Sequence, residues 1–145
     1  MQTEQILALD FGLKRIGVAV GNSLTGNAQA LCTIHTNVPE QVPDELLKIV
    51  QEWQPNKIIM GMPYNNDGTP SSMAGKIRSF AAMLSEKIEM PIEFIDESFT
   101  SHEASQQLTQ MRRSGARNKR VNKGDIDKAA AALVLQRWLD QKNSV

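Results

Sequence analysis

The stretch "ILALDFGLKRIGVAV", residues 6–20, contains two apolar segments joined at Gly12, Leu13 and Lys14. Short apolar segments bounded by a glycine-containing turn predict two strands, over residues 6–11 and 15–20. Asp10 stands at the end of the first segment, although aspartate is depleted in strands. Because a carboxylate that leaves water without a partner costs free energy, this charge among apolar residues requires an explanation.

The rest of the chain alternates between apolar segments of strand length and of helix length. We expect a strand over 30–36, a helix over 40–53, a buried strand over 57–63, a helix over 73–88, a strand from 91 to 96–98, a helix capped by Thr100 or Ser101, and a helix over 125–140. Three consecutive strands indicate an antiparallel meander, and strands that alternate with helices indicate parallel pairing. The sequence therefore predicts an α/β fold with a five-stranded mixed sheet flanked by helices.

Length and composition limit the class of protein. The 145 residues fit one domain, residues 1–145, and a hydrophobic content of 41% suits a single core and excludes a disordered chain. Cys32 is the one cysteine, which excludes an internal disulfide and a thiolate zinc site, and we expect it in the core. The chain has neither an apolar run of the roughly 18–20 residues that span a membrane nor a signal-peptide pattern at its start, so we expect a cytoplasmic protein with no membrane partner.

Three acidic residues occur in apolar surroundings. Asp10 and Glu97 follow strand segments, and Asp127 falls in the first turn of the last predicted helix, on the face that carries Ala131 and Val134. Carboxylates gathered at one sheet edge repel each other unless a cation neutralises them, and a ligand set of oxygens alone suits Mg²⁺ or Mn²⁺. Two such ions about 3.5–4 Å apart can hydrolyse a phosphodiester bond. The alternative is structural: local backbone hydrogen bonds at the strand ends and a favourable helix-dipole interaction for Asp127.

Two groups of basic residues are candidates for contact with a nucleic-acid backbone. Lys14 and Arg15 flank the first turn, and Arg15 is the stronger candidate because arginine binds phosphate in a bidentate manner. The second group lies in a segment without acidic residues and consists of Arg112, Arg113, Arg117, Lys119, Arg120 and Lys123. With equal numbers of basic and acidic side chains overall, such a local patch rather than net charge would attract nucleic acid. A solvated turn and a solvated loop are the alternatives.

Four segments in order resemble the motifs of the YqgF (RuvX) family of pre-16S rRNA nucleases, also described as Holliday-junction-resolvase-like. They are "LALDFGLKRIGVAVGN", "IIMGMPYNNDGTPS", "FIDESFTSHEA" and "KGDIDKAAAALVLQRWL". The resemblance implies an RNase H-like fold, divalent-metal chemistry at Asp10, Glu97 and Asp127, and 5′-end processing of pre-16S rRNA in the cytoplasm. Ser98 stands where the family usually has arginine, so any phosphate or carboxylate contact of that arginine must fall to another residue, such as Arg15.

We therefore expect a metal-dependent endonuclease that acts on pre-16S rRNA or a ribosomal precursor particle, with a two-ion Mg²⁺ or Mn²⁺ site. One alternative is a Holliday junction resolvase acting on four-way DNA, which must be a two-fold dimer, and the sequence leaves monomer and homodimer open. A second is a non-catalytic RNA-binding factor in ribosome assembly or transcription, which would have no use for three acidic residues. The segment "LDFGLKRIGVAV" also resembles the first phosphate motif of actin-like ATPases and sugar kinases. Those enzymes close two domains around ATP, and 145 residues supply only one.

Overall fold

The computed structural model describes residues 4–36, 38, 40–64, 69, 71–96 and 123–143. Its strands are β1 (Gln5–Phe11), β2 (Arg15–Asn22), β3 (Ala28–His35), β4 (Lys57–Met62) and β5 (Ile92–Asp96). Its helices are α1 (Asp44–Trp53), α2 (Ala74–Ile88) and α4 (Lys123–Asn143). Each of these elements was predicted to within a few residues, while the helix predicted after Thr100 or Ser101 lies outside the described residues. None of the described helices is long and apolar enough to cross a membrane.

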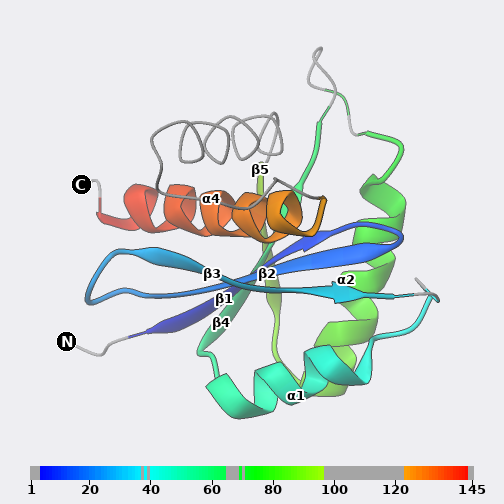
Figure 1. The fold of residues 1–145 in the computed structure, drawn as a ribbon, viewed down its shortest axis with the longest axis horizontal. Helices are drawn as coiled ribbons and strands as arrows, with labels where there is room; N and C mark the ends of the chain where they lie inside the picture. The colour runs from blue at the N-terminus through cyan, green and yellow to red at the C-terminus, as the bar shows by residue number, and fades with distance from the viewer. Residues whose placement is uncertain are drawn as a thin grey trace.

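The five strands form one sheet in the order β3-β2-β1-β4-β5. β1 pairs with β2, and β2 with β3, in antiparallel orientation, whereas β1 with β4 and β4 with β5 are parallel. The predicted mixed sheet is confirmed, and β1 lies at its centre. Figure 1 shows α4 lying across one face of this sheet and α1 and α2 on the opposite side.

β1 is buried on both faces because its side chains alternate between two apolar clusters. Leu7, Leu9 and Phe11 pack in the cluster that contains residues of α1 and α2. Ile6 and Ala8 pack in the cluster that contains residues of α4. Since side chains alternate along a strand, residue 10 shares the face of residues 6 and 8. The carboxylate of residue 10 therefore belongs to the α4 side of the sheet.

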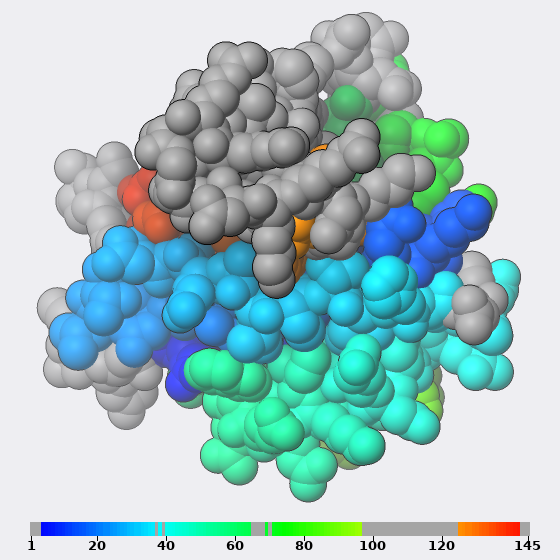
Figure 2. Space-filling view, viewed as in Figure 1, coloured from blue at the N-terminus to red at the C-terminus, as the bar shows by residue number. Residues whose placement is uncertain are grey.

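The face opposite α4 is covered by α1 and α2. α1 was expected from residue 40 but begins at Asp44, directly after Pro43, and Gln54 ends it in the left-handed conformation with φ 45°. Figure 2 shows the blue-to-cyan surface of β2 and β3 meeting the blue-green surface of α1. Cys32 on β3 is half-buried against this cluster rather than fully buried as predicted, and burial, followed by the Glu45 carboxylate, raises the pKa of its thiol.

α4 is fixed to the sheet by apolar packing and by one glutamine. The predicted apolar face is confirmed, and the fully or nearly fully buried residues are Ala130, Ala131, Val134, Leu135, Trp138 and Leu139. Gln136 accepts a hydrogen bond from the Ala28 backbone N–H at 2.9 Å and donates one to the Gly26 carbonyl at 2.8 Å. The helix begins at Lys123, two residues before the predicted start, so Asp125 lies in its first turn instead of capping it.

Gly17 allows the backbone of α4 to rest directly on β2. A Cβ atom placed on Gly17 would lie 2.0 Å from the carbonyl oxygen of Asp127 and 2.4 Å from its carbonyl carbon. These separations are far below van der Waals contact with backbone atoms that cannot rotate away, so a side chain at position 17 would force the helix off the strand. A glycine inside a strand is the sequence signal for such a close approach.

Gly17→Ala is expected to destabilise the protein by about 2 kcal/mol or more, because overpacking here must displace α4. Urea unfolding followed by circular dichroism measures this loss. Gly75→Ala is the matched control, since a Cβ at Gly75 meets no described atom within 4 Å. That control should leave stability unchanged or raise it by up to about 1 kcal/mol. Equal effects of the two substitutions would contradict the close contact at Gly17.

Candidate functional site

Asp10 and Asp127 are brought together by Gly17. Asp10 on β1 is the cross-strand partner of Gly17 on β2. Paired Cα atoms of antiparallel strands lie about 4.5–5.5 Å apart. The backbone of Asp127 rests on Gly17 from the α4 side, which is also the side that carries the Asp10 side chain. Two acidic residues separated by most of the chain therefore meet above one glycine.

Arg15 joins this pair through an ion pair with Asp127. The Arg15 Nε donates to Asp127 Oδ2 at 2.6 Å, across 112 residues of sequence. Arg15 is two residues before Gly17 on β2, so its side chain shares the α4 face. The two side chains are 29% and 22% exposed, which leaves the pair open to solvent on one side. Arg15, predicted as a phosphate ligand, thus also holds the carboxylate of a predicted metal ligand in place.

Lys14 occupies the turn between β1 and β2 and is exposed. The turn is closed by two backbone hydrogen bonds: Gly12 N–H donates to the Arg15 carbonyl at 2.9 Å, and Thr36 N–H donates to the Lys14 carbonyl at 3.0 Å. The second bond ties the turn to the end of β3. A fixed backbone therefore presents Lys14 to solvent beside Arg15, as a phosphate contact requires.

Most of the remaining predicted site residues lie outside the described residues. These are Glu97, together with Arg112, Arg113, Arg117, Lys119 and Arg120. Ser98, the departure from the family motif, also lies outside them. Lys123 is the first residue of α4, and its side chain is not among those described. The structure thus places two of the three predicted acidic residues and the two basic residues of the first turn.

The donor chemistry of the two placed carboxylates fits a hard divalent cation. Asp10 and Asp127 offer oxygen ligands alone, the set that Mg²⁺ and Mn²⁺ take. The Asp127 carboxylate binds one cationic group, the guanidinium of Arg15. Within the described ranges, no three Asp, Glu, His or Cys residues gather closely enough to hold an ion by themselves. A complete site would need a further ligand, and Glu97 is the predicted one.

Sequence reasoning missed Gly17 and Gln136 as positioning residues. Gly17 carried a readable signal, because an interior strand glycine indicates a bulge or a close backbone contact. Gln136 carried none, since a polar residue on a helix gives no sign that it will bridge two backbone groups of a distant turn. The Arg15–Asp127 pair also had no local signal.

A double-mutant cycle with Arg15→Gln and Asp127→Asn should give a coupling energy of about 0.5–1 kcal/mol, the range for a partly exposed pair with good geometry. Urea unfolding of the four proteins measures it. The control cycle uses Lys128→Gln and Asp125→Asn, whose charged atoms are 3.8 Å apart on α4. That cycle should give about 0.3 kcal/mol or less. Indistinguishable coupling in the two cycles would show that the Arg15 contact has no special strength.

The sequence is similar to those of known proteins over most of its length. The family model described as "RuvX: Holliday junction resolvase" matches residues 4–141. A protein of Pseudomonas putida named "Putative pre-16S rRNA nuclease" is 40% identical over 137 residues, which cover 93% of this chain and 94% of the relative. A protein of the same name from Dechloromonas aromatica is 38% identical over 140 residues, covering 97% and 93%.

Two solved structures share the fold. One is T. thermophilus RuvC in complex with a Holliday junction substrate, with a TM-score of 0.55, 14% identity, and coverage of 97% of this chain and 96% of that one. The other is the Fowlpox virus resolvase in complex with Holliday junction DNA, with a TM-score of 0.54, 12% identity, and coverage of 95% and 98%. The predicted RNase H-like fold is confirmed. Together with the matched motifs, these findings establish that the chain belongs to the RuvX family.

Proposed function

We propose that this protein is a metal-dependent endonuclease that hydrolyses phosphodiester bonds in structured RNA and processes the 5′ end of pre-16S rRNA. The observation that carries the proposal is the meeting of Asp10 and Asp127 above Gly17, on the face where Arg15 also lies. Membership of the family supports phosphodiester hydrolysis, and the names of the relatives support a ribosomal RNA precursor as the substrate.

Asp10, Asp127 and Glu97 are the proposed ligands of Mg²⁺ or Mn²⁺. When bound, a pair of such ions supplies activation of water and stabilisation of the leaving 3′-oxygen. Asp10 and Asp127 lie beside the same glycine on one face of the sheet, and acidic groups brought near each other favour a cation between them. Arg15 offsets part of that charge in the metal-free protein.

Arg15 also has the donors to bind the substrate. Its guanidinium carries five N–H donors, and the bond to Asp127 uses the one at Nε. The Nη groups can donate to a phosphate oxygen while Nε remains on the carboxylate. We propose that Arg15 orients the backbone of the substrate next to the acidic residues, with Lys14 adding a second positive charge from the turn.

Asp10→Asn is expected to abolish cleavage of a pre-16S rRNA fragment in Mg²⁺ or Mn²⁺, because the amide is a poor ligand for a hard cation. Gel analysis of end-labelled RNA measures the cleavage. Without metal, the melting temperature of this variant should equal or exceed that of the wild type, since one of two neighbouring negative charges is removed. Asp44→Asn, an exposed change on α1 on the other side of the sheet, is the matched control and should cleave normally.

Three results would contradict the proposal. Equal cleavage by wild type and Asp10→Asn would exclude a catalytic role for this carboxylate. Cleavage of a four-way DNA junction in preference to the RNA would assign the protein as a resolvase. Tight RNA binding without cleavage in either metal would assign it as a binding factor in ribosome assembly or transcription.

The basic residues at 112–123 are proposed to bind the RNA backbone. Replacing Arg117 and Lys119 by Gln should weaken RNA binding at every sequence tested and lower the slope of log affinity against log salt by about 0.7 for each lost phosphate contact. Fluorescence anisotropy over a salt series measures this slope. The control pair Lys48→Gln and Arg78→Gln makes the same change in net charge on α1 and α2, and it should leave the slope unchanged. An unchanged slope in the Arg117 and Lys119 variant, or an equal change of slope in the control, would contradict the proposal.

A further inference from the structure

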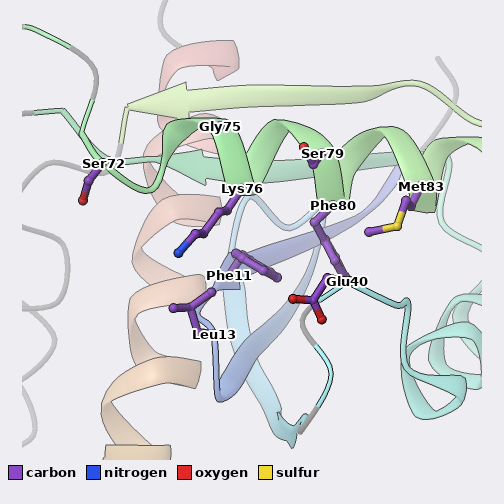
Figure 3. A pocket seen from close by; sticks show the side chains of 9 residues that line it. All are labelled: Phe11, Leu13, Glu40, Ser72, Gly75, Lys76, Ser79, Phe80 and Met83. Atoms are coloured by element: carbon purple, nitrogen blue, oxygen red, sulfur yellow. The ribbon is translucent and has the colours of Figure 1, made fainter.

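A cavity of about 650 Å³ lies between the β1–β2 turn and α2. Its volume falls within the range of small-ligand sites, about 300–1,000 Å³. Figure 3 shows Phe11 and Leu13 on one side and α2, with Gly75 and Lys76, on the other, while Glu40 comes from the segment before α1. Neither the two acidic residues nor Arg15 lines this cavity.

The cavity opens at the same end of β1 as the acidic residues, on the opposite face of the sheet. Phe11 directly follows Asp10, and neighbouring side chains of a strand point to opposite faces. Leu13 and Lys14 form the turn that connects the two sides. Positive side chains occur along this path: Arg15 on the α4 face, Lys14 at the turn, and Lys76 on the α2 face. A phosphate chain held at Arg15 can follow them around the end of the strand.

The lining offers an apolar surface between two opposite charges. The rings of Phe11 and Phe80 pack with their centroids 4.7 Å apart and form a buried floor. Leu13 is 39% exposed, so an apolar side chain at the rim of the cavity is in contact with water. Lys76 and Glu40 are both polar members of the lining, and neither forms an ion pair with any residue that the structure describes. A nucleotide matches these features, because its base is a flat ring with N–H donors and its phosphate carries a negative charge.

Gly75 keeps the cavity open. It lies in the first turn of α2, directly after Ala74. No atom in the described part of the protein lies within 4 Å of a Cβ placed on Gly75, so close packing gives no reason for this glycine. The missing side chain leaves free space beside Lys76 at the wall of the cavity. A ligand that occupies this space would account for a glycine at position 75.

We propose that this cavity binds an unpaired nucleobase of the substrate strand, next to the phosphate held at Arg15, and that Lys76 binds the phosphate of that nucleotide. This inference rests on the proposed function, because it assumes that an RNA strand crosses the end of β1. The base would cover Leu13, and Glu40 would accept hydrogen bonds from its N–H groups.

The test compares two single-stranded RNA 12-mers with equal numbers of phosphates, one with normal bases and one abasic, by fluorescence anisotropy without metal. The wild type should bind the normal strand about three- to tenfold more tightly, as expected when one base covers the exposed side chain of Leu13. Gly75→Phe, which fills the cavity, should remove this preference and leave the affinity for the abasic strand unchanged. Gly75→Ala adds one methyl group and should reduce the preference for bases to a value between those of the wild type and Gly75→Phe. Ser79→Phe, an exposed position one turn later in the same lining, is the second filling variant.

Lys76→Gln should weaken the binding of both strands about two- to fivefold, whereas Lys48→Gln, an exposed change on α1, should not. The proposal is overturned if the filled variants keep the preference for bases, or if they weaken both strands equally. Equal affinity of the wild type for a free mononucleotide and for the 12-mer would assign the cavity to a free nucleotide and overturn the substrate-strand proposal. Because no cleavage is measured, a failure here leaves the result for Asp10→Asn, and thus the proposed function, untouched.

Discussion

The contact between the backbone of Asp127 and Gly17 is the constraint on which the site depends. It sets how closely α4 approaches β2, since any side chain at position 17 would collide with the helix backbone. The approach brings Asp127 beside Asp10, the cross-strand partner of Gly17, and within 2.6 Å of Arg15. The long apolar face of α4 supplies the free energy that holds the helix there, and the glycine decides how close it lies.

The side chains at the end of β1 face two different environments, because they alternate between the two faces of the sheet. Asp10 faces α4 and the other acidic group, while Phe11 faces α2 and forms the floor of a cavity. A shift of one residue in the pairing of β1 would exchange these faces, putting an apolar ring among charges and a carboxylate in the core. The apolar side chains of β1 that are buried on both faces make such a shift costly, so the same residues that build the core fix the chemistry at its edge.

Much of the fold was predictable from the sequence, because apolar segments of strand and helix length read directly as elements. The charge at Asp10 among buried residues, and the place of Asp127 on the apolar face of α4, selected two site residues that the structure brings together. The contacts that complete the site were not predictable. The Arg15–Asp127 pair joins residues 112 apart, and the bonds of Gln136 depend on where the helix meets a turn. The start of α4 was missed because Asp125 reads as a cap.

The hydrogen bonds of Gln136 give the β2–β3 connection an unusual importance. A surface turn between two strands ordinarily tolerates insertions and deletions. Here the backbone groups of Gly26 and Ala28 hold the middle of α4, nine residues or about 14 Å along the helix axis from Asp127. An added residue in this turn would move these backbone groups out of reach of Gln136, so that α4 would lose two hydrogen bonds while its apolar face still holds it on the sheet. The turn is constrained in composition as well, because Gly26 has φ 68° and Asn22 Oδ1 accepts hydrogen bonds from the N–H groups of Leu24 and Thr25. A solvent-facing loop is thereby held to one length and one glycine by the helix that carries Asp127.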